Sequence, residues 1–81
     1  DYKNLAIFFE GPAKAGDEFA QYYYASCFYH RFGVDTDLKK AHMWYLKSAE
    51  QGFREAQSVV ASMYRGGYEK NVELAKLWEA K

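Results

Sequence analysis

The chain repeats itself, and this repeat restricts the possible fold more than any other feature of the sequence. Residues 13–28 read AKAGDEFAQYYYASCF, and residues 49–64 read AEQGFREAQSVVASMY. At a shift of 36 residues six positions are identical, where average composition gives roughly one by chance. The identical pairs are Ala13/Ala49, Gly16/Gly52, Ala20/Ala56, Gln21/Gln57, Ala25/Ala61 and Ser26/Ser62. A period in the mid-thirties is typical of stacked helical hairpins.

The repeat extends beyond these segments on both sides. Upstream, Phe8 aligns with Trp44 at the same shift, and the next residue in each copy is also aromatic. Downstream, Trp44 aligns with Trp78 at a spacing of 34, so the second copy has a loop two residues shorter. The unit therefore covers nearly the whole chain.

Each unit carries the pattern of two helices. Apolar residues recur at spacings of four, three and four, which places them on one helical face. They are Ala20, Tyr24, Cys27 and Phe28 in the first copy, and Ala56, Val60, Met63 and Tyr64 in the second. The following helix of each unit begins after a capping residue, Asp37 or Asn71.

Glycines mark where the helices end. Gly16 and Gly52 stand where a helix closes with a left-handed residue. The Gly66-Gly67 pair ends a helix that begins near Phe53.

These signals predict an all-α fold, an α-solenoid of about two helical hairpins preceded by one helix. Residues 1–15 form the second helix of a partial repeat, residues 16–51 the first repeat, and residues 52–81 the second. Pro12 has no amide hydrogen, so it is expected to kink the first helix or stop it near Glu10.

The same residues resemble the Sel-one-like repeat family, which is related to the tetratricopeptide repeats. The most specific string is A-x-x-W-Y-x-K-x-A-x-Q-G, found at residues 41–52. The first unit matches the family at Ala20, Gln21, Phe28, Gly33, Val34, Asp37, Ala41, Trp44, Tyr45, Lys47, Ala49, Gln51 and Gly52. The second matches it at Ala56, Gln57, Tyr64, Gly67, Ala75 and Trp78. Ala25 and Ala61 replace the family's glycine but are still small.

The resemblance implies a right-handed helical solenoid that acts as an adaptor or scaffold for a protein or peptide. A narrower alternative implied by the family is a bacterial immunity protein that neutralises a secreted toxin. One cysteine-rich branch is linked to weak β-lactam hydrolysis, but its paired cysteines are absent here because Cys27 is the only cysteine.

Charge and hydropathy exclude other classes of partner. Eleven basic side chains balance eleven acidic ones, and no basic run is present, which argues against nucleic acid and against a polybasic membrane anchor. The longest apolar run, residues 5–9, is too short to span a bilayer. The single cysteine rules out an internal disulfide and leaves the compartment open.

Trp44 and Tyr45 form either a ligand-stacking site or a wedge between helices. They follow Ala41 by three and four residues, so a small residue and a ring share one helical face. Ala25 offers space on the facing helix. Aromatic residues at a repeated helical spacing are usually core, and the wedge is therefore the favoured interpretation.

Other candidate sites are weak, and the sequence predicts no enzyme, cofactor or metal site. Cys27 and His30 are three residues apart, but a thiol–imidazole pair needs an orienting group and an oxyanion donor that the sequence does not identify. Cys27 also aligns with Met63, which favours a core thiol. The acidic residues of DTD, at 35–37, are read as a turn and a helix cap instead of a cation site. His42 is expected to be solvated.

One set of residues points to a binding surface. In helical-hairpin arrays the first helix of each unit lines the concave side, and 20% of this chain is aromatic. The predicted partner-binding residues are Phe19, Tyr22, Ser26, Tyr29 and His30 in the first unit, and Glu55, Ser58, Ser62 and Arg65 in the second. Rings with polar tips are favoured at recognition surfaces. Alternatively, Phe19 and Tyr22 pack against the first helix as a cap. Both interpretations remain open at this point.

The last helix carries apolar residues without a following unit. Leu74, Leu77 and Trp78 are expected to be uncovered, and the chain is expected to begin and end inside second helices. An uncovered face of this kind predicts neighbouring repeats or self-association.

Overall fold

The computed structural model describes residues 5–30, 34–66 and 72–79, and within these ranges it contains helices and no strand. The helices are α1 (Leu5–Lys14), α2 (Glu18–His30), α3 (Leu38–Glu50), α4 (Arg54–Gly66) and α5 (Val72–Glu79). The predicted all-α class and the order of one helix followed by two hairpins are confirmed.

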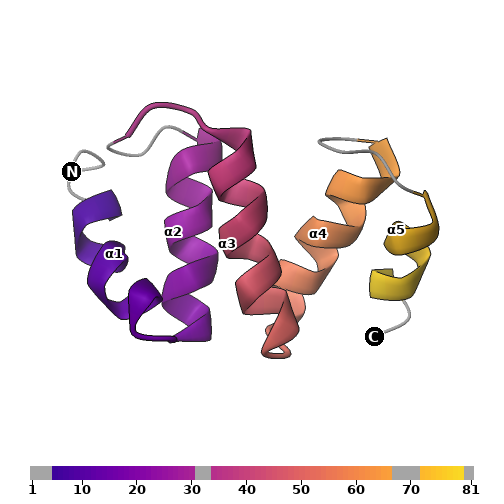
Figure 1. Cartoon of the computed structure of the whole chain (residues 1–81), viewed down its shortest axis with the longest axis horizontal. Helices are drawn as coiled ribbons and strands as arrows, with labels where there is room; N and C mark the ends of the chain where they lie inside the picture. Colours follow the sequence, from indigo (N-terminus) through magenta and orange to yellow (C-terminus); the bar gives the residue numbers. More distant parts are fainter. Residues whose placement is uncertain (1–4, 31–33, 67–71, 80–81) are drawn as a thin grey trace.

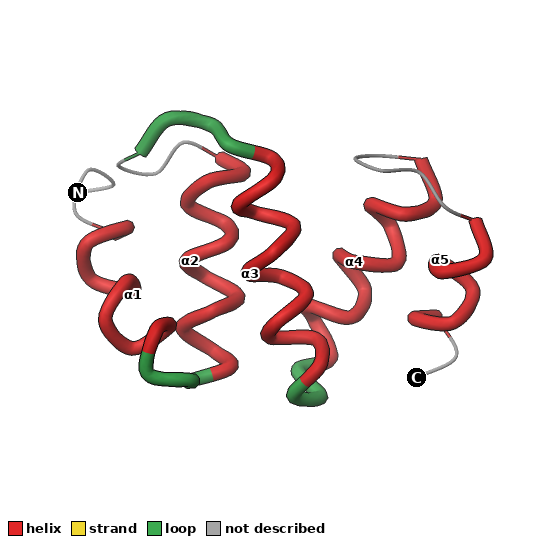
Figure 2. The backbone as a smooth tube through the Cα atoms, in the orientation of Figure 1, coloured by secondary structure: helices red, strands yellow, loops and turns green. Residues whose placement is uncertain are grey.

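The helices form a single row. They lie side by side in chain order from α1 to α5 (Figure 1), and neighbouring helices run in opposite directions (Figure 2). Each helix packs mainly on its neighbours in the chain, and the molecule measures 36 × 22 × 16 Å along its principal axes. Contacts of this nearest-neighbour kind are the hallmark of a helical solenoid.

A glutamine that is identical in the two units makes the same interaction in both. The side-chain amide of Gln21 donates to the carbonyl of Ala13, and that of Gln57 donates to the carbonyl of Ala49, each at 3.1 Å. Both bonds go to a carbonyl in the last turn of the preceding helix, which also accepts a hydrogen bond from the N–H of the turn glycine, Gly16 or Gly52. The recurring glutamine thus ties each second helix to the first helix of the next unit.

The turns between units use the predicted glycines. Gly16 has a φ of 103° and Gly52 a φ of 97°, a left-handed region that glycine enters without steric cost. Their position after α1 and α3 confirms the predicted helix ends.

The cap predicted at the start of α3 is also present. The carboxylate of Asp37 accepts a hydrogen bond from the backbone N–H of Lys40 at 3.1 Å. The corresponding prediction for Asn71 lies outside the described residues. Helix α4 ends at Gly66 as expected, while Gly67 is likewise outside them.

The sequence predicts that Pro12 kinks the first helix or stops it near Glu10, and the second of these two outcomes is wrong. Helix α1 continues through Pro12 to Lys14. The N–H groups of Ala15 and Asp17 bond to the carbonyls of Gly11 and Pro12, at 3.0 and 3.1 Å, and close the last turn. Proline removes only one hydrogen bond, and the Gln21 bond to Ala13 anchors the segment beyond it.

The aromatic wedge lies in the core. Trp44 and Tyr45 are both buried, and the Trp44 ring meets the Tyr24 ring edge-on, with centroids 5.2 Å apart. Ala25 is fully buried on α2, and Ala61 is buried at the equivalent position of α4. The structural interpretation of the two rings is therefore confirmed.

The last helix is better covered than the sequence predicts. Leu74 and Trp78 are partly buried and pack against the core, whereas Leu77 remains exposed. The expectation that all three side chains lack cover is wrong, because α4 and α5 pack together and turn Leu74 and Trp78 inward.

Candidate functional site

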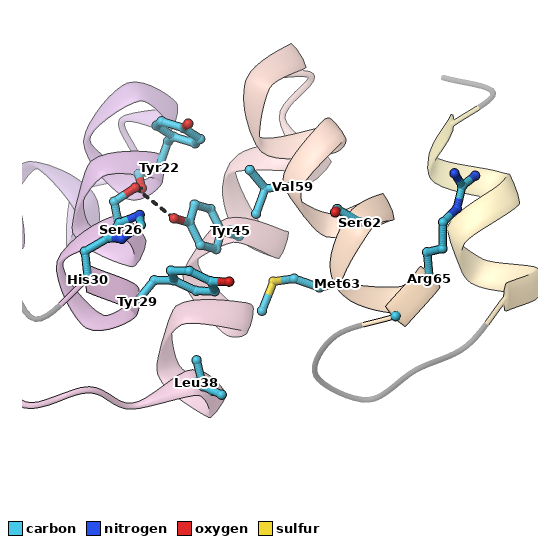
Figure 3. Close-up of a pocket in the computed structure, with 11 residues that line it drawn as sticks. Tyr22, Ser26, Tyr29, His30, Leu38, Tyr45, Val59, Ser62, Met63 and Arg65 are labelled. Atoms are coloured by element: carbon cyan, nitrogen blue, oxygen red, sulfur yellow. Dashed lines mark hydrogen bonds between the residues drawn. The ribbon is translucent and has the colours of Figure 1, made fainter.

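A groove of about 900 Å³ runs across the faces of α2, α3 and α4, and we call it the α2–α4 groove. Its lining residues are Tyr22, Ser26, Tyr29 and His30 from α2, Leu38 and Tyr45 from α3, and Val59, Ser62, Met63, Arg65 and Gly66 from α4. Figure 3 shows these side chains, with Tyr45 placed between the residues of α2 and those of α4. The groove thus joins the first helices of the two repeats across the second helix of the first repeat.

Six of the nine predicted partner-binding residues line this groove: Tyr22, Ser26, Tyr29, His30, Ser62 and Arg65. The other three lie elsewhere. Phe19 is exposed, and its ring contacts Tyr23 and Phe53, with centroids 4.7 and 6.1 Å away. Ser58 lines a second, smaller pocket. Glu55 is exposed on α4 outside the groove.

The sequence prediction missed the floor of the groove. Leu38 and Tyr45 belong to α3, a second helix of a repeat, and the prediction considered first helices only. Met63 was assigned wholly to the core, although it is buried and also lines the groove. A repeat alignment identifies which residues face inward, but it does not reveal which buried rings border a hollow.

A hydrogen bond between Ser26 and Tyr45 holds the floor of the groove in place. The hydroxyl of Ser26 donates to the carbonyl of Tyr22 at 3.1 Å, so the Tyr45 hydroxyl, 2.8 Å away, donates to Ser26. This direction follows because a serine hydroxyl has only one proton to donate. Burial raises the pKa of Tyr45, while the bond to Ser26 acts in the opposite direction. Tyr45 therefore remains a neutral donor at physiological pH.

Two tyrosines of α2 have different roles in the groove. Tyr22 is half-buried, with its ring 5.5 Å from that of Tyr45 and 5.3 Å from that of Phe53. Tyr29 is 45% exposed and lies 6.4 Å from the Tyr45 ring at the edge of the groove. Tyr22 is therefore packed into the side of the α2–α4 groove, whereas the ring of Tyr29 is accessible to solvent.

Tyr23 covers the first helix, which is the role that the alternative interpretation gave to Phe19 and Tyr22. Tyr23 stacks on Phe9 of α1, with centroids 5.4 Å apart and the planes at 19°. The rings of Phe19 and Tyr22 both reach Phe53, which precedes α4, and Tyr22 also lines the cavity beside Phe9 of α1.

Cys27 is a core thiol. It is 1% exposed, and burial raises its pKa. An activated cysteine requires the opposite shift, because the thiolate is the nucleophile. Cys27 and His30 both line a cavity of about 430 Å³ between α1 and α2, but the local environment disfavours the thiolate.

We expect Cys27 in the folded protein to react with a thiol reagent at least about tenfold more slowly than in denaturant, because reaction requires local opening. The rate of colour release from a chromogenic disulfide reagent, measured with and without urea, checks this. A fast native reaction that saturates below pH 7 would instead indicate an activated thiolate.

The remaining candidate sites have structural explanations. Asp37 caps α3 and Asp35 is exposed, and the described residues contain no group of three or more side chains placed to bind a metal ion. The expectation of a solvated His42 is wrong, since it is half-buried with its ring 5.1 Å from that of Tyr64 on α4. In the described part of the chain, every helix is too short or too polar to cross a bilayer.

Comparison with known proteins identifies the repeat. The sequence profile of the Sel1 repeat matches residues 19–53 and 54–78, which together make up more than half of the chain. Comparisons with curated proteins and with solved structures gave no match.

Proposed function

The chain belongs to the Sel1 repeat family, and from this premise we propose that it is a scaffold that binds a protein or peptide in the α2–α4 groove. Sel1 repeats are generally helical repeats that mediate protein interactions, and they are typically not enzymes. To this general role we add the surface that binds the partner, the α2–α4 groove.

The observation that carries the proposal is the exposed ring of Tyr29 at the edge of an apolar hollow. Tyrosine provides a large contact area at low cost in conformational entropy, which is why it is frequent among binding hot spots. Leu38, Val59 and Met63 supply apolar surface beside it, and methionine adapts to ligands of different shape. A side chain that enters here meets the edge of Tyr29 and the floor formed by Tyr45.

The polar groups of the groove are suited to a peptide backbone. Ser62 on α4 is exposed, and its hydroxyl can both donate and accept a hydrogen bond. His30 and Arg65 lie at the borders. Its volume of about 900 Å³ lies at the upper end of the roughly 300–1,000 Å³ that pockets for single small molecules span, so the groove has room for a short peptide segment.

We expect Tyr29→Ala to weaken binding by about tenfold or more while changing the free energy of unfolding by about 1 kcal/mol or less, since the ring is half exposed. The test selects short peptides from a random displayed library on the whole chain and measures their affinity by fluorescence anisotropy. Urea unfolding monitored by circular dichroism gives the stability of the same variant.

Tyr23→Ala is the matched control. Tyr23 lies on the same helix and is 39% exposed, but it lines the cavity beside α1 and not the groove. It should leave the affinity unchanged. If both variants bind like the parent, or if no peptide is selected, the groove is not the recognition surface.

A further inference from the structure

A second hollow adjoins the groove on the side of the last helix. This α4–α5 pocket, of about 320 Å³, is lined by Arg54, Gln57, Ser58, Ser62 and Arg65 of α4 together with Trp78 of α5. The two arginines and the two serines lie at spacings of four, four and three residues, which places them on one stripe of the helix. The stripe thus presents two guanidinium groups and two hydroxyls to one space.

The charge of this pocket is of one sign. None of the described residues that line it is acidic, and Arg54, which is exposed, forms no ion pair with a described residue. Glu50 borders a separate space that also involves Gln57 and Trp78. The described lining of the pocket therefore carries basic side chains and no acidic one, although the whole chain has no net charge.

The pocket and the groove are neighbours that share two lining residues. Ser62 and Arg65 line both of them. Arg65 leaves α4 beside the groove, and its guanidinium group extends toward α5 (Figure 3). A segment bound in the groove can therefore continue directly into the α4–α5 pocket.

We infer that the partner segment carries an apolar or aromatic side chain followed closely by carboxylates, which enter the α4–α5 pocket and pair with Arg54 and Arg65. Guanidinium groups form short, charge-assisted and often bidentate hydrogen bonds to carboxylates. The hydroxyls of Ser58 and Ser62 add neutral donors. This inference rests on the proposed function and specifies the chemistry of the partner, an acidic peptide segment.

The test uses the peptides selected on the whole chain from the random displayed library. The selected sequences should be enriched in Asp or Glu next to an apolar anchor. We expect Arg54→Gln to weaken binding of such a peptide about two- to fivefold, as an exposed ion pair does. The double variant Arg54→Gln/Arg65→Gln should weaken it by about five- to twentyfold, and added salt should reduce these differences.

A mutant cycle isolates the ion pair. Replacing the peptide's Glu by Gln should abolish the effect of Arg54→Gln, because the pair is already lost. Lys39→Gln is the matched control: it removes the same charge from an exposed residue that lines neither hollow, and it should leave the affinity unchanged.

The outcomes separate the inference from the function on which it rests. Selected peptides that depend on Tyr29 but lack acidic residues and ignore Arg54→Gln overturn the inference and leave the proposed function standing. Selected peptides that are insensitive to Tyr29→Ala, or a selection that yields none, overturn both. Peptides that depend on Tyr29 and show coupling between Arg54 and their carboxylates support both.

Discussion

Replacing Trp44 by alanine is expected to destabilise the protein by about 3–5 kcal/mol, as large aromatic truncations in cores do. The ring is buried between the two helices of the first repeat and meets Tyr24 edge-on at 5.2 Å. The ammonium group of Lys47 lies 5.7 Å from its centroid on the outer side. A domain of this size has a total stability of roughly 4–12 kcal/mol, so the substitution should remove about a quarter or more of it.

Met43→Ala provides the control for this prediction. Met43 is the preceding residue on the same helix and is 43% exposed, so its truncation should cost about 1 kcal/mol or less. Urea unfolding followed by circular dichroism at 222 nm measures both variants without relying on tryptophan fluorescence. Equal midpoints for the two variants would show that Trp44 is not the wedge between α2 and α3.

The repeat predicted the fold well because several identical positions have the same physical role in both units. Gln21 and Gln57 bind equivalent carbonyls, and Gly16 and Gly52 adopt the same left-handed conformation. The helix order and the buried face follow from such local and nearest-neighbour interactions, which a spacing in the sequence records directly.

The failed predictions concern residues whose environment is set by packing between helices. Helix α1 passes Pro12 because the Gln21 side chain anchors Ala13 beyond it. His42 is covered by Tyr64 of the following helix. Propensity and spacing describe an isolated helix, and in both places tertiary packing outweighs them.

The candidate site was only partly predictable for a related reason. Trp44 and Tyr45 were treated as one pair with one role, but the structure separates them. Trp44 is a core ring, whereas Tyr45 is buried and also forms the floor of the groove, where it bonds to Ser26. Tyr45 thus has a structural role and also lines the candidate binding groove, whereas the sequence pattern assigned it the structural role alone.

Enlarging Ala25 to leucine is the second substitution for which we expect a large effect, a destabilisation of about 1–3 kcal/mol. Ala25 has no exposed surface and lies on α2, which packs against both α1 and α3. Three added carbon atoms have no free volume at this position, so neighbouring side chains must leave their preferred rotamers or the helices must separate.

The same measurement tests Ala25→Leu, with Ser58→Leu as the matched control. Ser58 is exposed on α4 and lines the α4–α5 pocket, so a leucine there has room that the buried position of Ala25 lacks. The control should change the free energy of unfolding by about 0.5 kcal/mol or less. Close helix approach at the recurring alanines is what lets successive units stack. If Ala25→Leu is as stable as the parent, the helices approach less closely than the structure indicates. The recurrence of alanine in the two units would then need another explanation.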